Sequence, residues 1–348
     1  MTTETPRSRW ERIERTILVP FAAFSDSSEG RAKKEEPCSL RTIYQQDRDR
    51  IIHCKSFRRL KHKTQVLLLP EGDHYRTRLT HTLEVCQIAR TISRALALNE
   101  DLTDAIALGH DLGHTPFGHM GERVLDRIAC ERGLEGFAHA SQSLRVVDHL
   151  EKEGEGLNLS LEVRDGILKH SKGQVDVREG FSGGETTLTL EARVVRVSDS
   201  IAYINHDLDD AMRAGIVKPS DPPEDAIGIL GKTHGERIGR MVEDTVKHSG
   251  SWGITMSPGL LDAVEKMRSF LYQNVYASER VLKEEPKVEH VLRTLFDHYE
   301  KTPGGTIVPD GVSPCRMALD HVSGMTDRYA LFLFEKIAMP DPWPQIRR

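Results

Sequence analysis

The sequence has no apolar run approaching the roughly 20 residues that a membrane-spanning helix needs. Its first twenty residues, MTTETPRSRWERIERTILVP, also lack the apolar segment of a signal peptide. Cysteine is scarce, without a CxxC pair or regular spacing, and occurs at Cys38, Cys54, Cys86, Cys130 and Cys315. Free thiols of this kind are typical of a reducing compartment, so we expect a soluble cytoplasmic protein with no membrane partner.

The chain also lacks an excess of positive charge. Its 48 Lys and Arg residues face 53 Asp and Glu residues, which gives a formal net charge of -5. This balance argues against a wholly basic nucleic-acid-binding protein, although it leaves room for local basic patches. The 348 residues, 38% of them hydrophobic, suffice for one large globular domain or two smaller ones.

Strand-like alternation is the third thing that is scarce. Only KTQVLLL (63–69) and ETTLTLE (185–191) are candidates, and GQVDVREGFSGG (173–184) is typical of a loop or small hairpin. From Ser39 onward apolar residues recur at helical spacing, so an all-α fold is predicted. Ser39, Thr80 and the Ser257-Pro258 pair are candidate helix starts. Helices are expected at 39–60, 80–96, 101–111, 119–132, 139–153, 160–170, 189–214, 224–247, 258–276, 279–284, 288–300 and 315–335.

The composition along the chain suggests three parts. Residues 1–37 form a polar N-terminal arm, and its charged stretch SSEGRAKKEEP (27–37) is expected to be mobile. Residues 38–214 form a compact core. Residues 215–348 form a helical C-terminal part packed on that core, with no obvious linker between the two.

The stretch ALGHDLGHTPFGHMGE (107–122) concentrates three of the 16 histidines among four glycines. Because glycine weakens helices, this density predicts a close approach of backbone to a ligand. Near a helix end, His110 and Asp111 can both turn toward one ion. With His81 from an earlier helix and Asp199 from a later one, they offer two imidazoles and two carboxylates. Such a set suits Mn²⁺, Fe²⁺, Ni²⁺, Zn²⁺ or Mg²⁺, although each residue taken singly is more often structural.

These four residues resemble the H…HD…D pattern of the HD-domain metal-dependent phosphohydrolases, and the surrounding blocks resemble one branch more specifically. The blocks are FRRLKHKTQV (57–66), RTRLTHTLEVCQIAR (76–90), ALGHDLGHTPFGHMGE (107–122), QSLRVV (142–147), DSIAYINHDLDDAMRAG (199–215) and GMTDRYAL (324–331). In this order they are similar to the dGTPase-like deoxynucleoside triphosphate triphosphohydrolases. The resemblance implies an HD-domain core, a divalent metal ion, and conversion of a dNTP to deoxynucleoside and inorganic tripolyphosphate, which would control dNTP levels.

In that reaction water attacks the α-phosphorus and the 5′ oxygen of the sugar leaves, so a proton donor is valuable. The resemblance implies that His119 acts as this general acid or polarises the attacking water. Glu122, one helical turn later, would orient His119. For His114 two interpretations stay open: contact with a phosphate, or a backbone hydrogen bond in the glycine-rich turn.

The resemblance also implies five substrate contacts. Arg78 would clamp a phosphate, and His139 would lie near the phosphates. Gln65 would contact the sugar or base, Tyr203 would stack on the deoxyribose and exclude a 2′-hydroxyl, and Asp207 would accept from the 3′-hydroxyl. The last two follow Asp199 at i+4 and i+8 and therefore share its helix face.

Other polar and aromatic residues have plainer interpretations. Most of the basic cluster Arg58, Arg59, Lys61 and Lys63 is predicted to be a solvated face. Asp209 and Asp210 are predicted to be a solvated or helix-pairing charge run, and Tyr276 is predicted to pack in the core rather than reach the base. Beside His139, Ala138 and Ala140 depart from the polar residues usual in the resembled family.

Two alternatives remain: an HD phosphohydrolase acting on a monophosphate or guanosine alarmone, and a catalytically weak regulator that binds a nucleotide or DNA. The complete ligand set, together with His119 and Glu122, disfavours the regulator. The resemblance further implies a homo-oligomer, such as a hexamer, with a dNTP or single-stranded DNA as effector. No base preference is predicted.

Overall fold

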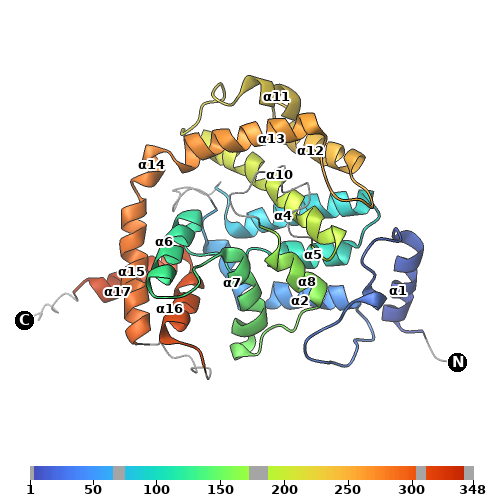
Figure 1. Ribbon diagram of the computed structural model, residues 1–348, viewed down its shortest axis with the longest axis horizontal. Coiled ribbons are helices and arrows are strands. Elements are labelled where there is room, and N and C mark those ends of the chain that lie inside the picture. The colour runs from blue at the N-terminus through green and yellow to red at the C-terminus, as the bar shows by residue number, and fades with distance from the viewer. Residues whose placement is uncertain (1–3, 66–74, 172–186, 303–310, 341–348) are drawn as a thin grey trace, which may run out of the picture.

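The structure is a computed structural model that describes residues 4–65, 75–171, 187–302 and 311–340. Within these ranges the regular secondary structure is helical, and β pairing is limited to isolated bridges (Figure 1). The all-α prediction is therefore confirmed. Of the strand candidates, 66–69 and 185–186 lie outside the described residues, as does the expected loop at 173–184, whereas Leu190 and Glu191 open a helix.

The helices run through the whole described chain. They are α1 (Pro6–Ile17), α2 (Ile43–His53), α3 (Lys55–Arg59), α4 (Arg78–Ala95), α5 (Glu100–Gly109), α6 (Gly118–Glu131), α7 (His139–Arg145), α8 (Leu161–Leu168), α10 (Leu190–Arg213), α11 (Glu224–Leu230), α12 (His234–His248), α13 (Pro258–Leu271), α14 (Glu279–Leu282), α15 (Glu285–Lys301), α16 (Pro314–Ser323) and α17 (Asp327–Ala338). Short 3-10 or π segments occupy Ser25–Ser27, Leu60–His62, Val146–Leu150, Lys152–Gly154 and Tyr272–Tyr276. Not one of these helices is both long and apolar enough to cross a membrane.

Two predicted helix starts are wrong by three residues. The cap of α2 is Thr42 rather than Ser39, and its N–H donates to Gln45 Oε1 at 3.1 Å. The cap of α4 is Thr77 rather than Thr80, because the hydroxyl of each threonine accepts from the backbone N–H of the other. The start at Ser257-Pro258 is confirmed. The shift in α4 places Arg78 and His81 in its first turn.

Buried side chains form two clusters, which cut across the three parts expected from the sequence. The larger cluster joins α2, α4, α5, α8 and α10 and extends to α11, α12 and α13. In the smaller cluster α6 packs against α15, α16 and α17, which stand together on one side of Figure 1. Residues 215–275 thus share the core of the preceding helices, and the three-part division stays a prediction.

A few buried side chains anchor the described N-terminal residues to the core, and the mobility of residues 27–37 stays a prediction. Arg31, with only 7% of its side chain exposed, pairs with the buried Asp47 and donates to the Asn158 carbonyl at 2.6 Å. The buried Glu14 accepts from Ser25 N at 2.8 Å. Arg31 therefore anchors the charged stretch to the core, while residues 32–37 are exposed.

Candidate active site

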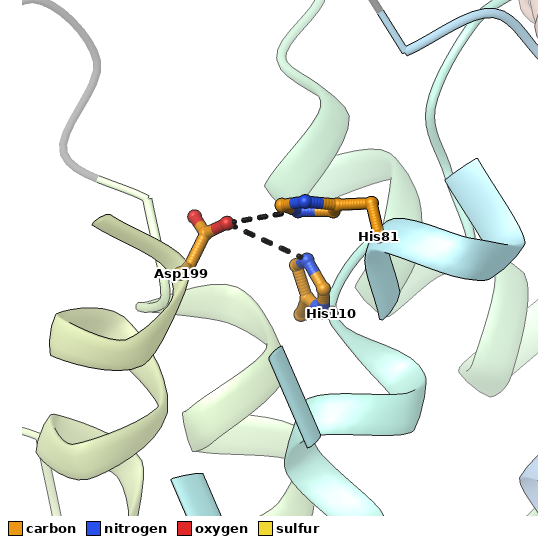
Figure 2. Close-up of side chains that lie close together, drawn as sticks. All are labelled: His81, His110 and Asp199. Carbon is orange, nitrogen blue, oxygen red and sulfur yellow. Dashed lines mark hydrogen bonds and ion pairs between the residues drawn. The ribbon is translucent and has the colours of Figure 1, made fainter. Parts of the chain in front are cut away.

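Two helix termini and one helix interior bring the expected metal ligands together. His81 lies in the first turn of α4, His110 caps the C-terminus of α5 and Asp111 follows it, and Asp199 lies within α10. His81 Nε2 is 3.1 Å from Asp199 Oδ1, and His110 Nε2 is 4.0 Å from the same oxygen (Figure 2). Asp111 Oδ2 is 3.5 Å from His110 Nε2. The four residues that the sequence singles out are therefore neighbours in space.

Both histidines face this centre, and His110 points a lone pair at it. His110 Nδ1 is 2.6 Å from the Ala107 carbonyl, which can only accept, so Nδ1 carries the proton and Nε2 the lone pair. That Nε2 is buried and has no hydrogen-bond partner. His81 Nδ1 lies 3.4 Å from His206 Nδ1, which leaves His81 Nε2 to face Asp199. Acceptors converge here, and a divalent cation would satisfy them together.

The two carboxylates are held in the charged form. Burial opposes ionisation of Asp111, but His110 and Arg78 bring its pKa well below the usual range. Burial also opposes ionisation of Asp199, but the hydrogen bond from His81 lowers its pKa. Two carboxylates and two imidazoles on one buried centre thus fit a divalent ion of the transition series or Mg²⁺.

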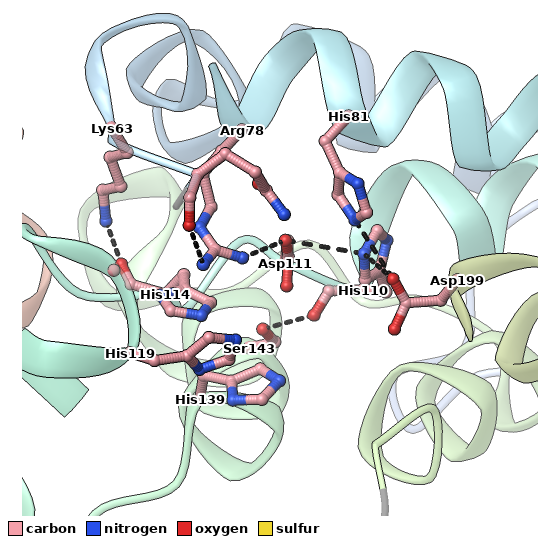
Figure 3. Close-up of polar contacts among 12 residues, drawn as sticks. Lys63, Arg78, His81, His110, Asp111, His114, His119, His139, Ser143 and Asp199 are labelled. Carbon is pink, nitrogen blue, oxygen red and sulfur yellow. Dashed lines mark hydrogen bonds and ion pairs between the residues drawn. The ribbon is translucent and has the colours of Figure 1, made fainter. Parts of the chain in front are cut away.

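A second group of side chains surrounds Glu122. Its Oε2 is 3.1 Å from His119 Nδ1, which confirms that the i,i+3 spacing on α6 places the carboxylate beside this imidazole. Its Oε1 accepts from both His139 N at 2.8 Å and His139 Nδ1 at 2.7 Å. One carboxylate therefore orients two rings. In Figure 3, His114, His119 and His139 gather on one side, and the Arg78–Asp111 pair separates them from His81 and His110.

His114 makes the backbone contact that was one of its two interpretations. Its Nδ1 accepts from Thr115 N at 3.1 Å, while Nε2 is buried without a hydrogen-bond partner, 4.0 Å from Glu122 Oε2. Burial, assisted by Arg78, brings the pKa of His114 well below its usual value, so the ring is neutral. A neutral ring that accepts at Nδ1 carries its proton at Nε2, where it can donate to a ligand.

The prediction of a solvated face is wrong for Lys63 and confirmed for Arg58, Arg59 and Lys61, which are exposed. Lys63 is buried and donates to the His114 carbonyl and, at 3.0 Å, to the Ser323 carbonyl. Burial lowers the pKa of its ammonium to about 7. Lys63 therefore ties the histidine-rich turn to the end of α16.

Of the expected phosphate and sugar contacts, Arg78 lies beside Asp111, an expected metal ligand. Arg78 donates to Asp111 Oδ2 at 2.7 Å and to the Thr64 carbonyl at 3.2 Å, so its guanidinium already has acceptors within the protein. Gln65 is buried, and its side-chain Oε1 has no hydrogen-bond partner. A phosphate clamp at Arg78 and a sugar or base contact at Gln65 stay predictions.

Tyr203 and Asp207 continue the face of α10 that carries Asp199. Asp207 is buried, accepts from the Tyr276 hydroxyl with one oxygen, and keeps Oδ1 unpartnered. Burial raises the pKa of Asp207 to about 7, against the effect of the Tyr276 hydrogen bond. Tyr276 thus has a polar role besides the expected packing. Lower on the helix, both Asp209 and Asp210 pair with Arg76 at 3.0 Å, which confirms the helix-pairing interpretation.

Two residues of the site, His170 and His206, were not predicted from the sequence. His170 follows α8, and its Nε2 is 3.1 Å from His139 Nε2. His206 lies seven residues after Asp199 and backs His81, and its Nε2 is 3.2 Å from Glu84 Oε2. The i+7 spacing from Asp199 could have revealed His206, since two helical turns return to the same face.

The glycines of the histidine-rich stretch serve a different purpose from the one expected. A Cβ at Gly113 would lie 2.1 Å from Ser143 N, and one at Gly121 would lie 1.9 Å from the Pro116 carbonyl oxygen. Gly113 therefore lets the backbone after Asp111 touch α7, which carries His139. These two glycines permit backbone to approach backbone, and an approach of this stretch to a ligand stays a prediction.

Comparison with known proteins agrees with this geometry. The model of the HD domain matches residues 78–204, and that of a phosphohydrolase-associated domain matches residues 254–336. The HD match and the site define an HD-domain hydrolase with a site for a divalent metal ion.

Proteins of similar sequence identify the family within this class of hydrolases. The chain is 52% identical to a deoxyguanosinetriphosphate triphosphohydrolase-like protein of Caldanaerobacter subterraneus subsp. tengcongensis, with 96% of each chain covered. Proteins of the same description from Desulfatibacillum aliphaticivorans and Clostridium tetani are 48% and 44% identical, with at least 96% of each chain covered. The chain belongs to the family of deoxyguanosinetriphosphate triphosphohydrolase-like proteins.

Proposed function

We propose that this protein hydrolyses deoxynucleoside triphosphates to deoxynucleoside and inorganic tripolyphosphate with the help of a divalent metal ion, and so controls dNTP levels. The observation that carries the proposal is the convergence of buried acceptors on one centre, with a carboxylate-held histidine beside it. His81, His110, Asp111 and Asp199 would hold the ion. It would supply Lewis-acid chemistry by polarising a phosphate oxygen and lowering the pKa of water.

The residues around Glu122 would handle the proton and the phosphate charge. His119 is positioned to protonate the leaving 5′ oxygen, because Glu122 fixes one ring nitrogen and the exposed ring can meet a substrate. Neutral His114 would donate from Nε2 to a phosphate oxygen, and His139 would line the same wall. Arg78 would supply a fixed positive charge between the two groups.

The face of α10 would recognise the sugar. Asp207 has an unpartnered buried oxygen that can accept from a 3′-hydroxyl, and Tyr203 lies one turn closer to Asp199, where a ring can cover the deoxyribose. Gln65 offers a second unpartnered buried acceptor to the sugar or base. A contact to a free 3′-hydroxyl supports a deoxynucleotide over a guanosine alarmone, which carries phosphate at that position.

Product analysis tests the proposal. The protein would be incubated with each dNTP, singly and mixed, with Mg²⁺ or Mn²⁺, and the products separated by ion exchange. Deoxynucleoside and tripolyphosphate are expected in equal amounts. Orthophosphate or pyrophosphate as the released product would contradict the reaction assignment. Faster turnover of mixed dNTPs would support the expected effector response, and sedimentation velocity would test the expected homo-oligomer.

The five free cysteines agree with the expected reducing compartment. The cytoplasmic location itself stays a prediction.

A further inference from the structure

A buried carboxylate from the C-terminal part of the chain reaches the backbone beside the proposed proton donor. Asp327, the first residue of α17, lies in the segment 254–336 that matches the phosphohydrolase-associated domain. It is buried, and its Oδ1 accepts from Phe117 N and its Oδ2 from Thr64 N, both at 3.1 Å. We propose that Asp327 is a positioning residue that holds His119 in place for proton transfer. The proposal rests on the proposed function, because that function assigns the proton donor to His119.

The turn that precedes α6 has no side-chain cap of its own. The helix begins at Gly118, and the side chain of Phe117, at the N-cap, makes no hydrogen bond to the first turn. Phe117 has φ 63° and Gly118 has φ 59°, so two successive residues are left-handed. A bulky residue adopts this conformation only at a cost, and it persists where the surrounding structure fixes it. The hydrogen bond from Phe117 N to Asp327 fixes the backbone at this point, and the Phe117 ring is buried among side chains of α15, α16 and α17.

His119 follows this turn by two residues, so its ring moves with the start of α6. Its bond to Glu122 joins two residues of the same helix and therefore fixes the ring only relative to α6. Glu122 also ties α6 to α7 through His139 N, one helical turn further on. Asp327 restrains the helix at its first residues, where His119 itself lies. The place of the ring thus depends on a carboxylate that lies 208 positions or more from it in sequence only through the fold.

The second oxygen of Asp327 holds the segment that supports Arg78. The Thr64 carbonyl accepts from Arg78 Nε at 3.2 Å, and Arg78 in turn pairs with Asp111 at 2.7 Å. Asp327 accepts from the N–H of the same Thr64. One carboxylate therefore links the start of the helix that carries His119 to an arginine that is bound to an expected metal ligand. This link sets the two halves of the site relative to each other.

A buried lysine makes a similar link at the other end of the turn. Lys63 donates to the carbonyl of His114 and, at 3.0 Å, to the carbonyl of Ser323, the last residue of α16 (Figure 3). Lys63 and Asp327 thus hold the segment 114–117 at both ends against the end of α16 and the start of α17. Burial raises the pKa of Asp327, whereas the hydrogen bonds that it accepts and the charge of Lys63 favour its ionised form.

Steady-state kinetics of the full-length chain test the proposal. Asp327→Asn keeps the shape of the side chain but leaves one acceptor oxygen for two backbone donors. We expect kcat for tripolyphosphate release to fall by up to about 100-fold, the cost of a misplacement of roughly 1 Å in an active site. The KM for the dNTP and the bound Mn²⁺, counted by plasma mass spectrometry, should stay near wild type, because the metal ligands are untouched.

A double variant shows whether Asp327 acts through His119. In the His119→Ala background most of the loss caused by Asp327→Asn should disappear, because the effects of coupled residues are not additive. A purely structural role of Asp327 would give the same loss in both backgrounds. Glu335→Gln changes an exposed carboxylate of the same helix and should leave kcat unchanged in both backgrounds.

The outcomes separate this inference from the proposed function. Wild-type protein that releases no tripolyphosphate would overturn both. Release that depends on His119 but is unaffected by Asp327→Asn, or is lowered equally in both backgrounds, would overturn only the role of Asp327, as would loss of bound Mn²⁺ in the folded variant. If circular dichroism shows that Asp327→Asn is unfolded, Asp327→Glu replaces it. The longer side chain keeps both oxygens but shifts the turn, so the same His119-dependent loss of kcat is expected.

Discussion

The two halves of the site are built from the same types of side chain, histidines and carboxylates, but arrange them for different purposes. In the half that contains His81, His110, Asp111 and Asp199, the Nδ1 proton of His110 faces outward, and its lone pair and the two carboxylates face the centre. In the half around Glu122, the carboxylate accepts hydrogen bonds from the rings of His119 and His139, so the ring protons lie between the imidazoles and the carboxylate. The first arrangement suits a fixed cation, and the second suits the transfer of a proton.

Exposure follows the same division. The side chains of His81 and His110 are 2% and 1% exposed, whereas the side chain of His119 is 61% exposed although its partner Glu122 is only 18% exposed. A metal ligand gains from burial, because a low dielectric strengthens its interaction with the ion. A proton donor must reach the substrate, so only its anchor needs to be buried.

Loss of Asp111 should have the largest effect. Asp111→Ala removes one carboxylate from the centre and leaves the buried Arg78 without its charged partner, so metal retention and dNTP turnover should both fall to background. Metal content and product release measure this, and circular dichroism checks that the helices remain. Asp209→Ala, which removes a carboxylate paired with Arg76, is the matched control. Full activity in the Asp111 variant would contradict its assignment as a ligand.

His119→Ala should separate the halves. Metal content and dNTP affinity should stay near wild type, while kcat falls by about 10²–10⁴-fold, the usual contribution of general acid catalysis. Arg123→Ala, on the exposed face of the same helix, serves as control. An unchanged kcat would show that another residue is the proton donor, with His114 and His139 as the candidates.

Changes at His206 should weaken the metal half without touching a ligand. His206→Leu removes the nitrogen that lies 3.4 Å from His81 Nδ1, and metal affinity should fall by about 10–100-fold, as for other residues that orient metal ligands. His206→Asn keeps an amide oxygen near the Nδ1 position and should restore most of the affinity. Titration of the chelated protein with Mn²⁺ measures both. Equal affinities in the two variants would show that this hydrogen bond does not position His81.

The smallest effect concerns Asp207, a buried carboxyl on the same helix face as Asp199 but without a histidine partner. Burial raises its pKa from 3.8 to about 7, so the folded state binds this proton more tightly. The resulting stabilisation is complete below about pH 3.8 and is lost as the pH rises through about 7. Asp207→Asn keeps an acceptor for Tyr276 and removes the titration.

Urea unfolding of the wild type and this variant measures the change. The free energy of unfolding of the wild type minus that of Asp207→Asn should fall as the pH rises from about 4 to about 7, and then level off. A difference that is independent of pH would show that Asp207 has an ordinary pKa.

Local patterns predicted much of this site. The adjacent His110 and Asp111 sit at a helix end as expected, and the three-residue spacing of His119 and Glu122 was enough to place their side chains in contact. Helical periodicity found the elements, but it missed breaks inside long runs: Gly231, with φ 118°, separates α11 from α12 in the run predicted at 224–247.

The rest depends on partners that are distant in sequence. Lys63 is buried because its acceptors come from residues 51 and 260 positions away, and no local pattern reveals them. His170 resembles any histidine after a helix until the fold brings it to His139, 31 residues away. Arg31 looked mobile because its partner Asp47 lies on another element.

Anomalous diffraction from crystals grown with Mn²⁺ tests the central claim most directly. We predict a manganese peak roughly 2.0–2.3 Å from His81 Nε2, His110 Nε2 and carboxylate oxygens of Asp111 and Asp199, the usual range of metal–nitrogen and metal–oxygen bonds. A manganese peak elsewhere would contradict the account. So would the absence of a peak at this centre in saturating Mn²⁺, with His81 and His110 still in contact with the carboxylates.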